Sequence, residues 1–390
     1  MTRFFGAAGA PAQSCAIGSV KSMIGHPKGS AGVAGLIKVA LGLHHKVLPP
    51  TLGVERPNTT AGFTDGPLYV NSEARPWMRA PDAPPRRAGV SAFGFGGTNF
   101  HLAVQEYADD YLPSSAAPVQ VWPSELFCWT AGSRAELSEH LEALEHALDG
   151  AGTEPALREL ARAVWAPDGG ARVGIAVVAA SIGDLRAKLV KVRDVLAAKA
   201  AGIWDRSGVY LTTEPLAGEG ALAFLYPGQG SQHPDMLRDL AICFPEIREA
   251  FERADAALAG RADRPLSATV FAPPGFDPDD VAARASALTR TDRAQPALGA
   301  AGMGLSRLLT AVGVTPSMTA GHSYGEYVAL CRAGVLDENV LYQLSEARGR
   351  SIIEAAEDDP GTMAAVSADP VSVRDVLGSA SDVWVANLNA

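Results

Sequence analysis

The fold of the C-terminal part of the chain is decided by the stretch Ala320-Gly321-His322-Ser323-Tyr324-Gly325-Glu326-Tyr327. Its Gly-x-Ser-x-Gly spacing is that of a nucleophile elbow, in which a serine occupies the tip of a sharp turn between a strand and a helix. The sequence before it is strand-like and residues 324–331 favour a helix. Ser323 would therefore face the N–H groups of a first helical turn, the donors that an acyl oxyanion needs. An ordinary Gly-Ser turn is the alternative.

Two further features support the elbow. Residues 222–226 (Leu-Ala-Phe-Leu-Tyr) predict a buried strand that runs into the glycine-containing loop 227–232, where the N–H of Gln229 could turn towards the serine. Arg348 lies on a predicted helix over residues 338–356. Its guanidinium could hold a carboxylate through two parallel hydrogen bonds.

These motifs together resemble the malonyl-type acyltransferase domain of fatty acid and polyketide synthases. The resemblance implies transfer of malonyl from malonyl-CoA to Ser323, and then to the phosphopantetheine thiol of an acyl carrier protein. It makes Ser323 the nucleophile, assigns the oxyanion N–H groups to Gln229 and Tyr324, and assigns the malonyl carboxylate to Arg348. The family's general base is a histidine far beyond the serine, so we expect the isolated chain, which ends at Ala390, to be inactive.

Composition limits the class of protein. The chain has 390 residues, of which 47% are hydrophobic and 19% charged, values that suit a globular protein of two or three domains. Its net charge of −10 argues against nucleic-acid or anionic-membrane binding. No apolar run approaches the ~20 residues of a membrane span. The four cysteines, Cys15, Cys128, Cys243 and Cys331, are scattered along the chain, so we expect reduced thiols in a cytoplasmic protein. No cysteine or histidine cluster has zinc-type spacing, and we expect no bound metal or cofactor.

The N-terminal part has its own pattern. Residues 14–23 alternate like a strand, residues 29–43 predict a small-residue helix, and residues 90–93 and 100–105 predict a hairpin joined through a glycine-rich loop.

Residues 19–26 (Ser-Val-Lys-Ser-Met-Ile-Gly-His) and 89–101 resemble the C-terminal part of a β-ketoacyl (ketosynthase) condensing domain. The sequences of both segments are most similar to those of iterative type I synthases of the enediyne and polyunsaturated fatty acid kinds. The resemblance places Lys21 and His26 in the active site, where the histidine binds the thioester carbonyl and drives malonyl decarboxylation, and it places Phe95 beside the acyl pocket. A capped core histidine is the alternative for His26.

The departures from this family matter. A condensing domain needs a nucleophilic cysteine on an elbow and a first histidine in a His-Gly-Thr-Gly-Thr motif, and neither is present; Cys15 precedes the histidine motif and is not that nucleophile. We therefore expect residues 1–107 to be an incomplete ketosynthase part. Residues 108–218 would form a linker domain without catalytic groups, and residues 219–390 an incomplete acyltransferase part.

The expected fold class is α/β throughout: the end of a thiolase-like condensing domain, a small α/β linker domain and an α/β-hydrolase-like acyltransferase core. In the linker we predict strands over 125–131 and 173–179 and helices over 133–148, 154–165 and 182–200. A strand–helix–strand pattern over residues 362–366, 370–377 and 383–387 looks like the start of a ferredoxin-like subdomain.

Two other functions stay open. The chain could be a catalytically incompetent linker or docking fragment. A serine esterase of the α/β-hydrolase type needs an acid and then a histidine downstream of the serine, but no histidine follows His322. The expected partners are the acyl carrier protein and the rest of the synthase, as a homodimer in the intact enzyme.

Overall fold

The N-terminal part contains a hairpin with a helix packed on it and two further two-stranded sheets. The computed structural model describes all residues except 109–121, 151, 166–172, 215–219, 357–361, 381, 387 and 389–390, so the start of the predicted linker domain lies largely outside the described residues. The elements of this part are α1 (Thr2–Ala7), β1 (Cys15–Ile17), α2 (Lys21–Ile24), α3 (Ala31–His45), β2 (Val47–Leu48), β3 (Leu68–Val70), β4 (Arg75–Pro76), β5 (Arg87–Phe93) and β6 (Asn99–Gln105).

The predicted hairpin and small-residue helix are both confirmed. Strands β5 and β6 pair antiparallel from Arg87↔Gln105 to Phe93↔Asn99. Helix α3 packs on β5 through its glycines: a Cβ on Gly32 would lie 3.3 Å from Ala92, and one on Gly35 would lie 3.3 Å from Val90. Small residues thus let the helix approach the strand closely.

The prediction of one strand over residues 14–23 is wrong in its second half. Only Cys15–Ile17 forms a strand, paired in parallel with Leu68–Val70, and Lys21–Ile24 is a helical turn. The side chain of Ser19 accepts a hydrogen bond from the N–H of Lys21 at 3.2 Å. This local bond favours a turn over continued strand pairing.

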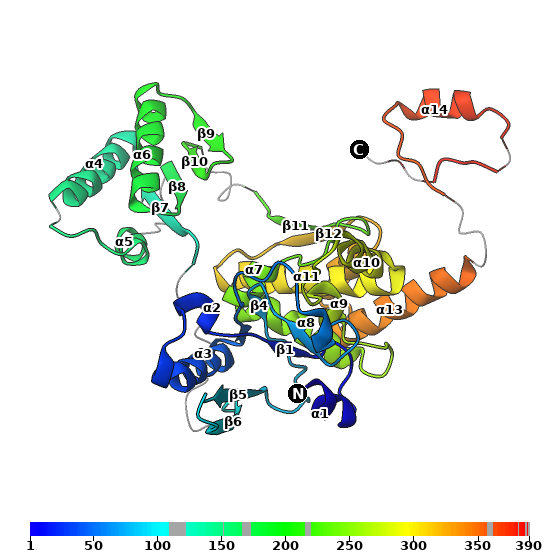
Figure 1. The fold of residues 1–390 in the computed structure, drawn as a ribbon. Helices are drawn as coiled ribbons and strands as arrows, with labels where there is room; N and C mark the ends of the chain where they lie inside the picture. The colour runs from blue at the N-terminus through cyan, green and yellow to red at the C-terminus, as the bar shows by residue number, and fades with distance from the viewer. Residues whose placement is uncertain are drawn as a thin grey trace.

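The linker domain is a four-stranded antiparallel sheet, in the order β7-β8-β10-β9, with helices packed on it (Figure 1). The predicted strands are confirmed residue for residue and the predicted helices to within a few residues. The apolar stripe of α6 is buried, with Leu185, Leu189 and Val192 fully inaccessible to solvent. Its elements are β7 (Glu125–Ala131), α4 (Arg134–Gly150), α5 (Leu157–Val164), β8 (Val173–Ala179), α6 (Ile182–Ala197), β9 (Gly202–Asp205) and β10 (Val209–Thr212).

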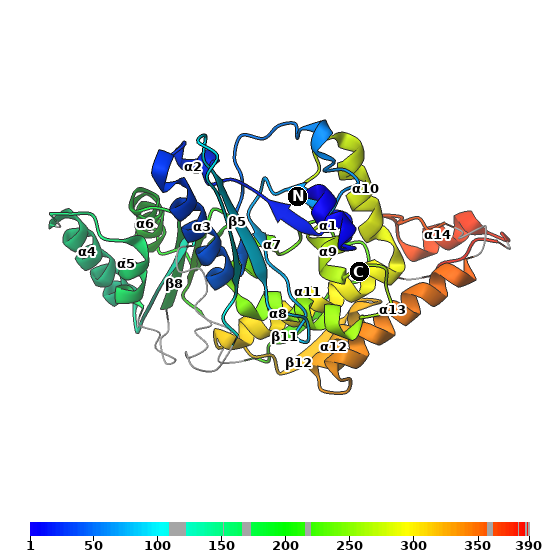
Figure 2. The ribbon, with the colours of Figure 1, turned by 60° about the horizontal axis from the view of Figure 1, so that its bottom comes forward.

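The acyltransferase part is built around the long helix α11, which packs against α8, α12 and α13 (Figure 2). Two parallel strands, β11 and β12, pair with Tyr226 opposite Gly321. The elements are β11 (Ala223–Tyr226), α7 (Arg238–Cys243), α8 (Pro245–Ala257), α9 (Leu266–Val270), α10 (Pro278–Thr289), α11 (Thr291–Ala311), β12 (Met318–Gly321), α12 (Gly325–Arg332), α13 (Glu338–Ala355) and α14 (Pro370–Leu377).

The strands predicted at 362–366 and 383–387 are not formed, whereas the helix between them is α14. Residue 387 lies outside the described residues; the rest of both segments is unpaired chain. Met363 and Trp384 are 89% and 74% exposed, and α14 buries none of its side chains. An extended segment becomes a strand only where another strand takes up its backbone hydrogen bonds, and no described segment does so here.

A buried ionic network joins the N-terminal part to helix α8. The guanidinium of Arg86, with 3% of its side chain exposed, is paired with Glu106 at 2.8 Å and also with Glu252 of α8. Glu252 additionally accepts a hydrogen bond from the backbone N–H of Arg79 at 3.0 Å. Burial raises the pKa of Glu252, and the neighbouring guanidinium groups oppose that rise.

Candidate active site

Ser323 lies at the tip of the turn between β12 and α12, exposed to solvent, with a φ of +53°. This left-handed conformation is uncommon for a residue with a Cβ and costs about 1–2 kcal/mol. Such strain persists only where the surrounding structure enforces it, and it is concentrated at functional sites. The sequence prediction of a sharp strand-to-helix turn with the serine at its tip matches this geometry.

The glycines of the motif allow the turn to close. A Cβ on Gly321 would lie 2.0 Å from the carbonyl carbon of Gly325, and one on Gly325 would lie 2.1 Å from the carbonyl oxygen of Tyr226. These are backbone atoms that cannot swing aside, so only glycine fits at either position. A Cβ on Gly228 would lie 3.3 Å from the Cβ of Ser323. The loop after β11 therefore packs directly against the serine.

Backbone hydrogen bonds hold this arrangement. The N–H of His322 donates to the carbonyl of Tyr226 at 3.0 Å, and the N–H of Glu326 donates to the carbonyl of Ser323 at 3.1 Å. The first bond continues the strand pairing up to the serine, and the second begins helix α12.

The two residues whose N–H groups are assigned to the oxyanion differ in burial: Tyr324 is buried and Gln229 is exposed. Tyr324 is 1% exposed and its hydroxyl shares a 2.7 Å hydrogen bond with Ser345, while burial raises its pKa. Its ring belongs to the core, so only its backbone N–H can serve the site. Gln229 is exposed, and its side chain contacts Thr291 at 3.3 Å. In the described part of the chain, neither N–H donates a hydrogen bond.

Arg348 is half-buried, with its guanidinium carbon 5.5 Å from the centre of the Tyr327 ring. Within the described ranges it forms no ion pair. Arg350, two residues on, is paired with Glu346 at 3.4 Å and points elsewhere, as the helical spacing predicts. Next to Arg348, a Cβ on Gly349 would lie 2.5 Å from the Cα of Asp292. Arg348 thus flanks the N-terminal end of α11, the same end that contacts Gln229.

Two histidines belong to the motifs of the site, His322 in the elbow and His233 just after the Gln229 loop. His322 is exposed, and its Nδ1 faces Gly228, 3.1 Å from where a Cβ would stand on that glycine. His233 is bonded through Nδ1 to the carbonyl of Pro234 at 3.0 Å. No ring of a described histidine is hydrogen-bonded to Ser323.

Lys21, His26 and Phe95, which the resemblance assigns to the ketosynthase site, lie on the surface of the N-terminal part. Lys21 and His26 are exposed, and Phe95 is fully exposed on the hairpin loop. Nδ1 of His26 accepts a hydrogen bond from the N–H of Lys28 at 3.1 Å, so the histidine is capped but not in a core. Burial raises the pKa of the free Cys15 thiol, which disfavours the nucleophilic thiolate.

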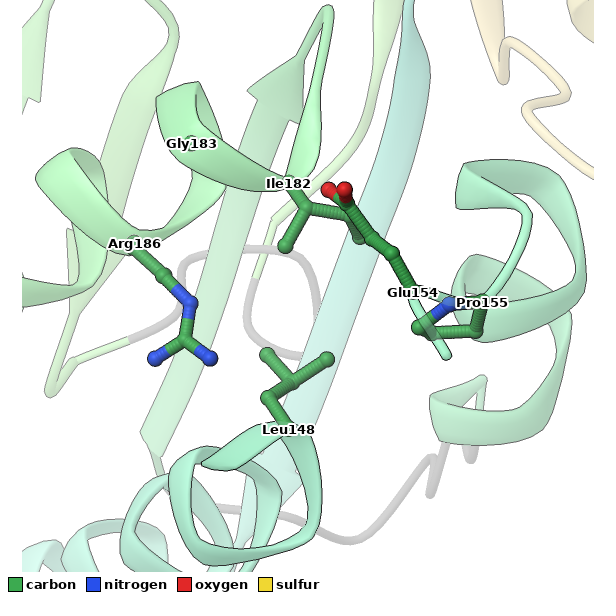
Figure 3. A pocket seen from close by; sticks show the side chains of 6 residues that line it. All are labelled: Leu148, Glu154, Pro155, Ile182, Gly183 and Arg186. Atoms are coloured by element: carbon green, nitrogen blue, oxygen red, sulfur yellow. The ribbon is translucent and has the colours of Figure 1, made fainter. Parts of the chain in front are cut away.

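A shallow hollow in the linker domain, away from Ser323, is shown in Figure 3. The guanidinium of Arg186 there is paired with Asp149 at 2.7 Å. The residues that line the hollow include no combination of a nucleophile and a general base. It is lined by Leu148, Glu154, Pro155, Ile182, Gly183 and Arg186.

Two other kinds of site are absent from the described ranges. No group of three or more histidine, cysteine, aspartate or glutamate side chains there could hold a metal ion. None of the described helices combines the length and apolar character needed to cross a membrane.

One pair of contacts was not predictable from motifs. Gln295 and Thr291, both on α11, contact the side chain of Gln229. They belong to none of the motifs discussed above, and the only sequence signal is their spacing of four residues, which puts them on one helical face.

Comparison with known proteins confirms both resemblances. Residues 223–390 match the acyl transferase domain family, and residues 1–55 match the C-terminal domain of beta-ketoacyl synthases. One of the subunits of a polyunsaturated fatty acid synthase of Thraustochytrium sp. is 33% identical over 97% of this chain. The spectinabilin polyketide synthase system protein NorB of Streptomyces orinoci is 36% identical over 96% of it.

The chain spans only 14% and 16% of the length of these two relatives. Among solved structures, the acyl transferase domain of ZmaA is 22% identical and shares the fold with a TM-score of 0.50, covering 60% of this chain and 50% of that one. The chain therefore carries the C-terminal domain of a β-ketoacyl synthase followed by an acyl transferase domain, as part of the polyketide and polyunsaturated fatty acid synthase family.

Proposed function

We propose that the acyltransferase part transfers a malonyl group from coenzyme A to the phosphopantetheine thiol of an acyl carrier protein, through an ester on Ser323. The single observation that carries this proposal is the strained serine at φ +53°, packed against the Gly228 loop. A serine hydroxyl held at a helix N-terminus, beside unpaired N–H groups, suits covalent acyl transfer.

The reaction has two steps. Ser323 Oγ attacks the thioester carbonyl and gives its proton to a general base, for which the family resemblance implies a downstream histidine; the coenzyme A thiol leaves. The carrier-protein thiol then attacks the ester carbonyl and the serine regains its proton. In each step the N–H groups of Gln229 and Tyr324 would donate to the oxyanion of the tetrahedral intermediate.

The guanidinium of Arg348 supports malonyl as the acyl group. A carboxylate taken out of water is costly without a partner, and a guanidinium satisfies both of its oxygens. Arg348 lies beside Tyr327 and flanks the helix end that contacts Gln229, with no described acidic group neutralising it. A serine esterase would leave this arginine without a role.

For the N-terminal part, we propose that Lys21 and His26 act in decarboxylative condensation and that Phe95 borders the acyl pocket, once the rest of the synthase is present. The partners would be the carrier protein and the remaining domains of a cytoplasmic, homodimeric synthase. This part of the proposal rests on the resemblance of residues 19–26 and 89–101 alone.

The test is single-turnover acylation followed by intact-mass spectrometry. In the synthase that supplies the downstream histidine, malonyl-CoA should add one malonyl group, the adduct should map to Ser323, and holo carrier protein should then accept it. The isolated chain should be acylated at most slowly and substoichiometrically. Ser323→Ala should abolish the adduct, whereas Ser351→Ala, at an exposed serine of α13, should not. An adduct that persists in Ser323→Ala, or no adduct in the wild-type synthase, would overturn the proposal.

Selectivity is tested by a matched pair of arginine variants. Arg348→Ala should slow malonyl acylation by ~30- to several thousand-fold, the equivalent of losing one partner of a desolvated charge pair, and leave acetyl acylation unchanged. Arg350→Ala should change neither, because Arg350 is exposed and paired with Glu346. An unchanged malonyl-to-acetyl ratio in Arg348→Ala would remove the arginine from the site.

A further inference from the structure

One face of helix α11 contacts both residues whose N–H groups are assigned to the oxyanion. Thr291, Gln295 and Gly299 are spaced four residues apart and share that face. Thr291 and Gln295 both contact the side chain of Gln229. A Cβ on Gly299 would lie 2.6 Å from the hydroxyl oxygen of Tyr324. The helix therefore supports the loop after β11 and the start of α12 at the same time.

The buried amide of Gln295 is costly for stability. Gln295 is 1% exposed, and its only described partner is Gln229, whose Oε1 accepts a hydrogen bond from Gln295 Nε2 at 3.4 Å. Its own Oε1 is buried without a hydrogen-bond partner among the described residues. A buried acceptor left unpaired costs about 1–3 kcal/mol. A leucine of similar size would avoid this cost, so stability does not account for the amide.

The loop that carries Gln229 is held at several points. Ser231 Oγ donates to the carbonyl of Gly228 at 2.8 Å, and the side chain of Gln232 accepts from the N–H of Gly230 at 2.8 Å. These bonds set the loop on the C-terminal side of Gln229. The other described restraints on Gln229 are the contacts of its side chain with Thr291 and Gln295 of α11.

We propose that Gln295, assisted by Thr291, is a positioning residue of the acyltransferase site. Its amide holds the Gln229 side chain so that the Gln229 N–H points at the carbonyl oxygen that becomes negative when Ser323 attacks. Gln295 touches no reacting atom and acts only through Gln229. The inference rests on the proposed function and adds a residue that supports its oxyanion donor.

The test compares Gln295→Leu with Gln343→Leu in the synthase that supplies the downstream histidine. Gln343 Nε2 on α13 donates to the carbonyl of Ala257 at 3.3 Å, a similar amide bond away from Gln229. Single-turnover acylation is measured against malonyl-CoA concentration, which separates the maximal rate from half-saturation. Gln295→Leu should lower the maximal rate by up to about 10²-fold, the loss attached to a misplacement of about 1 Å. The malonyl-CoA concentration at half-saturation should not change. Gln343→Leu should match wild type in both the maximal rate and this concentration.

A stability measurement separates positioning from a structural role. Because Gln295→Leu removes a buried unpaired acceptor, its urea stability should equal or exceed that of wild type while its acylation rate falls. A rate that falls together with stability would mean that the amide only supports the fold, and would overturn the inference.

A double-mutant cycle tests whether Gln295 acts through Gln229. Gln229→Ala keeps the backbone N–H but removes the side chain that Gln295 holds. Gln295→Leu should then have no further effect on the maximal rate. Additive losses would overturn the inference.

The failures of the two proposals are distinguishable. If wild type is not acylated on Ser323, the proposed function fails. If wild type is acylated and Gln295→Leu reacts as fast as Gln343→Leu, only the positioning role fails.

Discussion

Replacing Ser323 by glycine should stabilise the acyltransferase core while abolishing acylation. The serine sits at φ +53°, where a residue with a Cβ pays about 1–2 kcal/mol. Glycine removes that strain but loses about 0.4–1 kcal/mol through the greater freedom of the unfolded chain. Ser323 is exposed and its hydroxyl forms no hydrogen bond with the described residues, so little else is lost. The net gain should be about 1 kcal/mol, the difference between these two effects. Ser323→Ala keeps the Cβ and the strain, and should match wild type.

The measurement is urea-dependent hydrogen exchange followed by mass spectrometry. Peptides from α12 report the elbow, and peptides from α6 in the linker domain serve as an internal reference that neither variant should alter. Both variants should lose the malonyl adduct. Equal unfolding free energies for Ser323→Gly and Ser323→Ala would show that the elbow is not strained, and would refute the argument that its strain marks a functional serine.

Three further predictions concern the supporting structure. Glu252→Ala should cost about 3–5 kcal/mol, because it removes one of the two carboxylates paired with the buried Arg86 guanidinium, and hydrogen exchange in residues 76–90 should accelerate. Exposed Glu249→Ala is the control, and equal exchange in the two variants would contradict the network. Burial raises the pKa of Asp255 to about 6, above its unfolded value, so the stabilisation from its protonated form is complete below about pH 4 and is lost as the pH rises through 6. Urea titrations should show this fall in wild type and a flatter profile in Asp255→Asn; parallel profiles would disprove it. Leu189→Ala should destabilise the linker domain by about 2–5 kcal/mol, because the side chain is fully buried, yet leave the rate of Ser323 acylation unchanged. A fall in the acylation rate together with the loss of stability would mean that the linker domain and the active site are coupled.

The sequence alone determined the features that depend on neighbouring residues. The elbow around Ser323 follows from Gly321 and Gly325, because the clash each would cause lies within the motif or on the paired strand. The linker helices follow from an apolar stripe of helical period, and Leu185 and Leu189 are indeed buried. Both signals are local, so they can be interpreted without knowing the rest of the fold.

Contacts between residues that are distant in the sequence depend on the packing of the whole chain. Gln295 meets Gln229 across 66 positions, and Arg86 meets Glu252 across 166, and no local pattern encodes either contact. Residues 362–366 have a strand-like composition but no strand, because backbone hydrogen bonds in a sheet require a partner that sequence pattern does not supply. Pairing and burial are properties of the whole packed chain, and they determine which polar side chains are brought to Ser323.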